Sequence, residues 1–262
     1  MSEQAAGATD RPAGHFDIRA FARTAAGSHR DVLGLEAYAE HPLSADTLRT
    51  LSFLHNTERA TMTYLRSVLV TATHKDARIT AFLTTWAFEK YWIADALGQI
   101  VKAHDPEAAV SNDSDDHATP IRESIVGNVV GVPMIGVHMA LCTIDEWVTQ
   151  SAYARLAEIA GHEQLSDSVA RFLDVKARHV DFLEAQARHR LSGSRTSRTL
   201  ARRRIRRTRW PIGAADQPRA EQQHFFNTLL ADRPDLVAGL DARIDGLPGL
   251  DGLALISKAV AG

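Results

Sequence analysis

The stretch FLDVKARHVDFLEAQARH, Phe172 to His189, has the spacing of an amphipathic helix with two ionisable residues on its inner face. Phe172, Lys176, His179 and Leu183 follow one another at steps of four, three and four residues. Such steps place side chains on one side of a helix. An ammonium and an imidazole therefore face the same way as the apolar residues, and the stretch predicts a helix whose buried side holds charge.

Four long segments with this periodicity predict an all-α fold, and no segment alternates as a strand would. Short turns join the first segment to the second and the third to the fourth, so each pair is expected to form an antiparallel hairpin. Residues 104–132 would then cross the length of the bundle. The expected helices run from Ser44 to about Ala72, Asp76 to about Ala103, Pro133 to Gly161, and Ser166 to Leu191.

Three regions follow from this pattern. Residues 1–43 are polar and punctuated by Gly and Pro, which indicates an extended arm with one short helix near Phe16 to Arg23. Residues 44–191 form the bundle. Residues 192–262 hold an Arg-rich segment, two short helices near Gln217 to Leu230 and Pro234 to Ile244, and a Gly-rich apolar tail.

Composition narrows the class of protein. A chain of 262 residues that is 45% hydrophobic can bury one sizeable core with an appended smaller piece. The net charge of -2 gives no global attraction to nucleic acid or membrane. The single cysteine, Cys142, excludes an internal disulfide and a Cys-rich metal site. No apolar run reaches the roughly 18 residues of a membrane helix, so we expect a soluble, cytoplasmic protein.

Each expected helix carries an ionisable residue at mid-length on its inward side. Glu58, Glu89 and Glu146 lie on the first three helices, and Lys176 and His179 on the fourth. Counted from the hairpin turns, these residues lie about 15–17 positions away, which at about 1.5 Å per residue puts them near one level. Buried charges require partners or a metal. We expect one buried polar layer.

This pattern resembles the ferritin-like superfamily of di-iron carboxylate proteins over residues 44–191. That family has Glu on helix one, Glu-x-x-His on helix two, Glu on helix three and Glu-x-x-His on helix four. KARHVDFLEAQ is close to the family's frequent DEARH run. The resemblance implies a ferritin-like four-helix bundle. Its metal-ligand positions are Glu58, Glu89, Glu146 and His179 in this sequence.

Two positions depart from the family pattern. Trp92 stands where the helix-two His is expected and removes a nitrogen ligand, and Lys176 replaces the bridging helix-four Glu. A Lys between two cations is repulsive, so a standard di-iron site is not expected. The alternatives are no metal at all, or a single iron or manganese on Glu89, Glu146 and His179 with Lys176 turned outward.

The candidate catalytic residues are the members of this layer, Lys176, Glu58, Glu89, Glu146 and His179. Coupled ionisable groups in one buried layer suit acid–base chemistry, and a desolvated Lys can act as a base or a nucleophile. The alternative is that the charges pair with one another and hold the core together. No cofactor-binding residues are identified.

Other polar residues near the inner faces have structural interpretations. His55 and His138 are interpreted as core or supporting residues that could also serve as alternative ligands. Asp145 is expected to support the layer beside Glu146, and Cys142 to fill space.

The segment Arg195–Arg209 has eight arginines in fifteen residues and no acidic residue. An acidic carrier protein is a candidate partner for it, by the resemblance to the acyl-carrier-protein desaturases. Nucleic acid is not expected, because no reading motif accompanies the arginines. The alternative is a solvated helix paired with the acids of Asp113–Asp116.

Together these features favour an unusual enzyme of small-molecule or secondary metabolism, with oxidoreductase-like or acid–base chemistry at a Glu/Lys/His centre. The alternative function is a metal-free scaffold or ligand-binding protein, with a homodimer as a candidate assembly.

Overall fold

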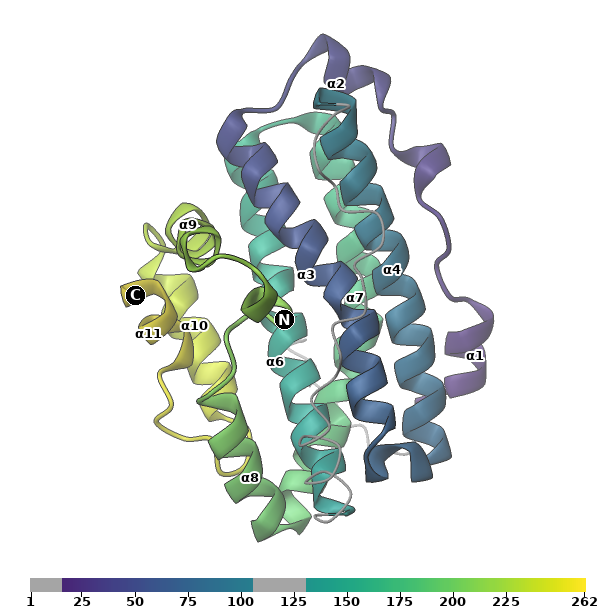
Figure 1. Ribbon diagram of the computed structural model, residues 1–262, viewed down its shortest axis with the longest axis vertical. Helices are drawn as coiled ribbons and strands as arrows, with labels where there is room; N and C mark the ends of the chain where they lie inside the picture. Colours follow the sequence, from purple (N-terminus) through teal and green to yellow (C-terminus); the bar gives the residue numbers. More distant parts are fainter. Residues whose placement is uncertain (1–15, 106–130) are drawn as a thin grey trace, which may run out of the picture.

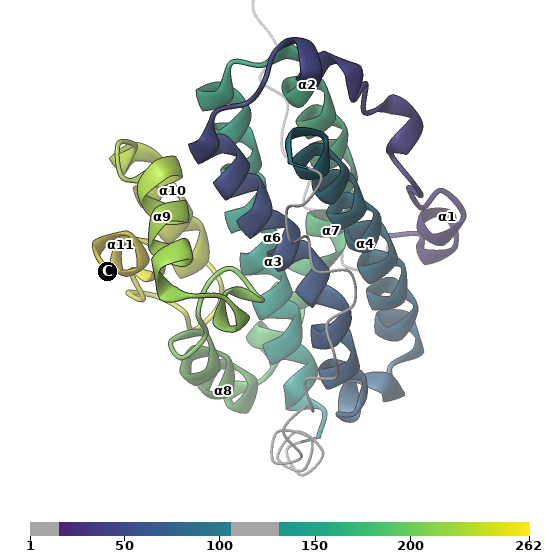
Figure 2. The same ribbon diagram turned by 45° about the horizontal axis from the view of Figure 1, so that its top comes forward.

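The computed structural model describes residues 16–105 and 131–262, and all regular elements in these ranges are helices. Four long helices run side by side as the main body (Figure 1). The N-terminal segment covers one flank of this body, and four shorter helices cover another. Turning the view shows the same arrangement (Figure 2). The expectation of an all-α chain is confirmed for the described residues.

The first hairpin consists of α3 (Ala45–Leu69) and α4 (Ala77–His104). The Ser44 hydroxyl accepts a hydrogen bond from Thr47 N and begins α3, and the Asp76 carboxylate accepts from Ile79 N and begins α4. Both are standard N-cap contacts, which satisfy N–H groups that the helix itself leaves unpaired. A short 3₁₀ turn, Ala72–Lys75, joins the two helices, so the predicted hairpin is present.

The second hairpin consists of α6 (Pro133–Ala160) and α7 (Glu163–Gly193). Pro133 lies in the first turn of α6, and Gly161 ends the helix with a φ of 56°, a conformation that favours glycine. The fourth helix begins three residues earlier than predicted. His162 caps it, because the His162 ring accepts a hydrogen bond from Leu165 N.

The N-terminal segment lies along α4 and contributes aromatic residues to the core. It contains α1 (Ile18–Arg23), a 3₁₀ turn (Arg30–Val32) and α2 (Glu36–Glu40). The ring of Phe21 stacks on that of Phe82 of α4 with centroids 5.0 Å apart. The predicted short helix is therefore present and is packed against the bundle.

The C-terminal region packs on α6 through α8 (Arg195–Ile205), α9 (Arg219–Leu230) and α10 (Pro234–Asp245), with α11 (Leu255–Ala261) against α9 and α10. Neighbours on several sides explain why α6 is apolar around most of its circumference. One hydrophobic core includes residues of the bundle and of these short helices. The C-terminal extension is thus continuous with the bundle core.

The predicted crossover, residues 104–132, lies mostly outside the described residues. None of the helices in the described ranges is long and apolar enough to cross a membrane.

Candidate functional site

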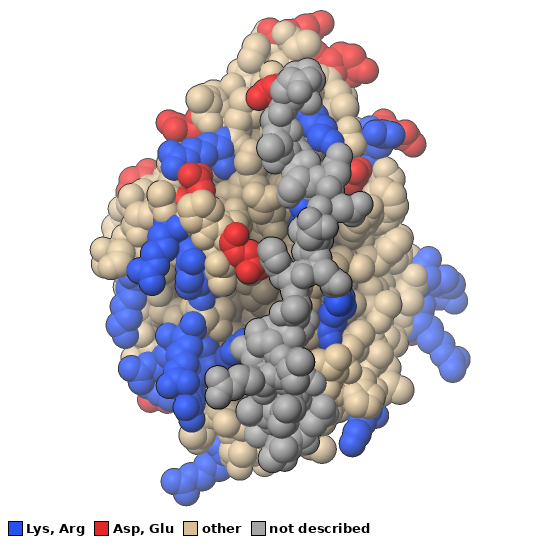
Figure 3. Space-filling view, in the orientation of Figure 1, with Lys and Arg blue, Asp and Glu red and all other residues tan. Residues whose placement is uncertain are grey.

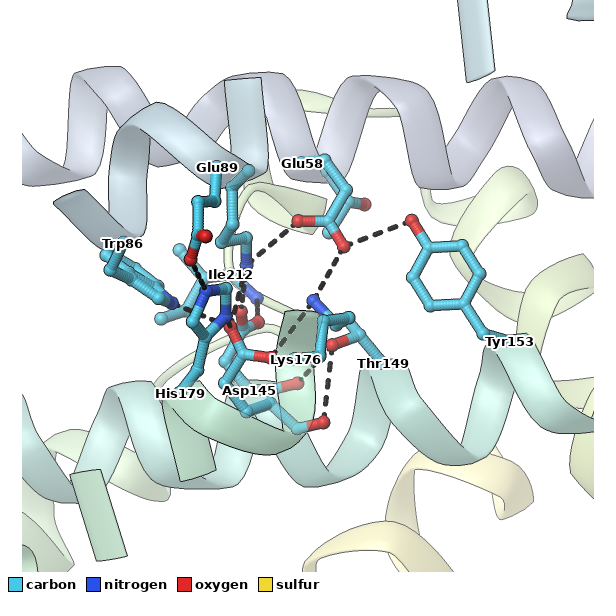
Figure 4. Close-up of polar contacts among 12 residues, drawn as sticks. Glu58, Trp86, Glu89, Asp145, Thr149, Tyr153, Lys176, His179 and Ile212 are labelled. Carbon is cyan, nitrogen blue, oxygen red and sulfur yellow. Dashed lines mark hydrogen bonds and ion pairs between the residues drawn. The ribbon is translucent and has the colours of Figure 1, made fainter. Parts of the chain in front are cut away.

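The five predicted site residues meet at mid-length between the four long helices (Figure 4). Together with two residues that sequence reasoning did not assign to the centre, they form what we call the buried ion-pair network. All its members are 0% exposed. The network consists of Glu58 from α3, Glu89 and Lys90 from α4, Asp145 and Glu146 from α6, and Lys176 and His179 from α7.

Lys176 points into the bundle and joins α7 to α3 and α6. Its Nζ lies 2.9 Å from Glu58 Oε1 and 3.0 Å from Glu146 Oε2. The Tyr153 hydroxyl also donates to Glu58 Oε1, at 3.1 Å. Lys176 is therefore not turned outward in this structure, as the single-metal alternative would require. Its ammonium is held by two carboxylates.

Lys90 makes a second set of ion pairs that sequence reasoning missed. Its Nζ lies 2.8 Å from Asp145 Oδ2, 3.0 Å from Glu58 Oε2 and 3.8 Å from Glu146 Oε1. A signal was present, because Trp86, Lys90 and Ile93 follow the same four-and-three spacing that identified Lys176. Glu58 thus binds one ammonium through each of its oxygens.

His179 connects Glu89 to Glu146. Its Nε2 lies 2.7 Å from Glu89 Oε2, and its Nδ1 lies 3.3 Å from Glu146 Oε1. Both ring nitrogens of His179 therefore face carboxyl oxygens. Trp86 Nε1 donates to the same Glu146 oxygen at 2.7 Å.

Segments outside the four helices close both sides of the network. Ala26 N in the N-terminal segment donates to Glu89 Oε1 at 2.7 Å, and the Arg178 guanidinium pairs with that same oxygen. Ile212 N, after α8, donates to Asp145 Oδ1 at 2.7 Å. The two backbone contacts belong to no sequence motif. The ion pair of Arg178 could not be predicted either, because Arg178 is not on the apolar face of its helix.

Acidic and basic side chains of this layer face one another. The carboxyl groups of Glu58, Glu89, Asp145 and Glu146 lie against Lys90, Lys176, Arg178 and His179. Glu58 Oε2 and Glu146 Oε2 have no well-directed hydrogen bond, yet each lies 3.0 Å from an ammonium nitrogen. We interpret these two contacts as ion pairs, because Coulombic attraction depends on distance more than on angle.

Ion pairing lowers the pKa of two carboxyl groups in the layer, whereas burial outweighs Lys90 at Asp145 and raises its pKa. Burial raises the pKa of Glu146, but Lys176 and Lys90 outweigh it and hold that pKa well below the usual value. The pKa of Glu58 is lowered by the same balance. Burial would lower the pKa of Lys90, yet Asp145 and Glu58 raise it well above its usual value. The pKa of Tyr153 is raised well above the usual value by burial and by Glu58.

The donor set does not suit a metal ion in this arrangement. Each ammonium lies where a cation would contact the carboxylates, and among the described residues no three His, Cys, Asp or Glu side chains group to share a metal. Trp92, which stands where the resemblance would place a His ligand, makes no ring contact with the described residues of the network. It is half-buried, and its ring contacts Phe88 and Tyr91.

The remaining predicted residues have structural contacts. His55 Nδ1 lies 2.8 Å from Ala94 O, and His138 Nδ1 lies 2.8 Å from Thr73 Oγ1, so neither contacts the network. Burial lowers the pKa of His138 to about 3. Cys142 is buried, with its thiol 3.9 Å from the Tyr64 hydroxyl. Asp145 is a full member of the network, not only a support beside it.

Two surface pockets lie away from the network. One, of about 550 Å³, is lined by arginines of α8 and of the turn that follows it, and the other, of about 430 Å³, lies between α2 and the start of α7. Neither includes a network residue. A catalytic centre needs an open pocket at Lys176 that a substrate can enter, whereas a structural centre needs none. The full burial of the network agrees with a filled layer.

Comparisons of the chain with protein-family models, with curated proteins and with solved structures found no match. The assignment of this centre therefore rests on its geometry.

Proposed function

We propose that this chain is a metal-free, ferritin-like helical protein whose buried ion-pair network is structural, and that it serves as a scaffold or ligand-binding protein. One observation carries the proposal. The ammonium nitrogens of Lys90 and Lys176 lie 2.8–3.0 Å from the carboxylates of Glu58, Asp145 and Glu146, in a layer that is 0% exposed. In this account the two lysines supply the positive charge that metals supply in di-iron proteins.

The arrangement of the helices supports the ferritin-like part of the proposal. Two antiparallel hairpins bring Glu89 of α4 and Glu146 of α6 against His179 of α7. They also bring Glu58 of α3 against Lys176 of α7. Buried ion pairs of this kind cost desolvation and are retained where they fix one arrangement of the helices. The network would then set the register of the four helices against one another.

The catalytic alternative requires that a substrate reach Lys176. Its ammonium is fully buried and engaged by two carboxylates, so base or nucleophile chemistry would need a rearrangement of α3 and α7. The structural role needs no movement. For this reason the scaffold proposal is preferred over enzymatic chemistry at this centre.

Reductive methylation followed by mass spectrometry tests this choice, because the chain has internal controls. Lys75 and Lys258 are exposed, whereas Lys90 and Lys176 are buried. The proposal predicts that formaldehyde with a borohydride reagent modifies Lys75 and Lys258 in the folded chain, and Lys90 and Lys176 only in denaturant. Modification of Lys176 in the folded chain at the rate of Lys75 would contradict it and favour an accessible catalytic amine.

Metal content tests the same proposal independently. Protein from cells supplemented with iron and manganese should contain far less than one metal ion per chain. One or more ions per chain, lost together with stability on chelation, would contradict the proposal. A cytoplasmic location, a homodimer and an acidic carrier protein as partner stay predictions; light scattering on the purified chain tests the homodimer.

A further inference from the structure

The arginines of α8 form a second candidate site, independent of the buried network. Ser197, Ala201 and Ile205 are buried, and the Ser197 hydroxyl donates to Pro133 O at the start of α6. A Cβ added at Gly136 would lie 3.2 Å from Ser197, so α8 packs closely on α6. This contact turns the basic face of α8 outward. At the lower left of Figure 3, Lys and Arg side chains gather over α8.

A pocket of about 550 Å³ is present on this face, within the size range of small-molecule sites. Five guanidinium-bearing side chains and the loop before α11 line it. The lining residues include Arg198, Arg202, Arg203, Arg206, Arg207 and Gly249. No other lining residue is charged, so the pocket carries five positive charges and no negative one.

Two of these arginines are held in place by neutral groups. The Arg198 guanidinium donates to Leu191 O at 2.8 Å, and that of Arg202 donates to Asp251 O at 2.7 Å. Gly249 has a φ of 81°, and a Cβ there would lie 2.7 Å from Arg198 Cδ. Backbone carbonyls position the two guanidinium groups without neutralising them, so the pocket is pre-organised and remains strongly positive.

The other three arginines are exposed and lie close together in sequence. Within residues 16–105 and 131–262, Arg203, Arg206 and Arg207 have no carboxylate partner. Crowded like charges repel one another, and an anionic ligand would relieve that repulsion. The alternative pairing with Asp113–Asp116 falls outside the described residues.

The side chains that line the pocket favour phosphate groups over other anionic partners. The planar guanidinium fork matches phosphate oxygens, and several forks in one pocket suit more than one phosphate group. None of the lining residues is aromatic, so the base-stacking surface typical of single-stranded nucleic-acid sites is lacking in the pocket. α8 has no large exposed apolar residue with which to enter a membrane.

We propose that this α8 pocket binds a small molecule with two or more linked phosphate groups. Arg198 and Arg202 form its fixed wall, and Arg203, Arg206 and Arg207 close on the ligand. Inorganic polyphosphate and the phosphate chain of a nucleotide share this chemistry.

Isothermal titration calorimetry of the full chain with tripolyphosphate tests the proposal. We expect saturable binding at one per chain, weaker binding of orthophosphate, and affinity that falls between about 50 and about 200 mM salt. Arg203→Ala/Arg206→Ala/Arg207→Ala should weaken binding at least about tenfold, since three charge-assisted contacts are lost. The matched control, Arg19→Ala/Arg23→Ala/Arg30→Ala, removes three exposed arginines at the N-terminal segment and should change affinity less than about twofold.

Three results would overturn the proposal: no binding of tripolyphosphate at low salt, equal losses in the two triple variants, or tighter binding of hexa-aspartate than of tripolyphosphate. The last result would indicate an acidic protein as the partner. ATP distinguishes the sources, because affinity equal to that of tripolyphosphate indicates recognition of the phosphate chain alone and tighter binding indicates a nucleotide. Circular dichroism melts confirm that each triple variant is folded.

Discussion

Replacing Lys176 with Met should strongly destabilise the chain, because it leaves two buried carboxylates without their shared ammonium. Lys176 Nζ lies 2.9 Å from Glu58 and 3.0 Å from Glu146. Each contact supplies about 5 kcal/mol of attraction at an effective dielectric constant of about 20. Met avoids the several kcal/mol that burying an ammonium costs, so the net loss is about 3–5 kcal/mol.

Thermal melts by circular dichroism measure this loss. For a chain of this size it corresponds to a fall in Tm of roughly 6–20 °C. Lys75→Met, at an exposed lysine, is the matched control and should change stability by less than about 0.5 kcal/mol. A Tm for Lys176→Met within about 2 °C of that control would refute the reasoning, because it would show that the ammonium does not stabilise the network.

The stability difference between the native chain and Lys176→Met should depend on pH. In the native chain the pKa of Glu146 is held well below its ordinary value of 4.5. Its contribution is therefore full above pH 4.5 and is lost as the pH falls through the folded pKa. In Lys176→Met burial prevails and raises the pKa of Glu146. The stability gap between the two proteins should be widest near pH 7 and narrow towards pH 5, and a constant gap would contradict this.

Three further changes test other parts of the structure. Asp145→Asn should lower the free energy of unfolding in urea by about 1–3 kcal/mol, because Lys90 loses a charged partner while Ile212 N keeps an acceptor; an unchanged midpoint would contradict this. Between pH 7 and pH 5 the native chain should lose about 2 kcal/mol of stability at His138, because the buried ring has a pKa of about 3 whereas a His in the unfolded chain is protonated below about 6.5. His138→Asn should not show this loss. Parallel pH profiles of the two proteins would contradict this. Gly213→Ala should lower the Tm, because φ is 92° and the new Cβ would lie 2.5 Å from Ala60 Cβ; a native Tm would exclude that clash.

The long helices could be predicted within a few residues because their ends carry strong local signals. Ser44 and Asp76 cap α3 and α4, and Pro133 and Gly161 bound α6. The start of α7 was misplaced because His162 caps it, and His is not a usual N-cap residue. Local chemistry thus determines the boundaries where the common capping residues occur.

The predicted site was incomplete because it assigned too few ionisable residues to each helix. Lys90 lies next to Glu89, and Asp145 next to Glu146, so two adjacent residues of one helix both reach the centre. The spacing of Trp86, Lys90 and Ile93 contained that information for α4. Backbone donors such as Ile212 N have no sequence signal, because they depend on how α8 and the loop after it pack on α6.

The central claim is that ammonium groups take the place of metal charge between the carboxylates of the bundle. Crystals of the full chain grown with Mn²⁺ and measured at the manganese absorption edge test it most directly. The account predicts no anomalous peak in the centre of the bundle, with Lys176 Nζ within hydrogen-bonding distance, about 3 Å, of Glu58 and Glu146. An anomalous peak among Glu89, Glu146 and His179, with Lys176 turned away from Glu58, would contradict it.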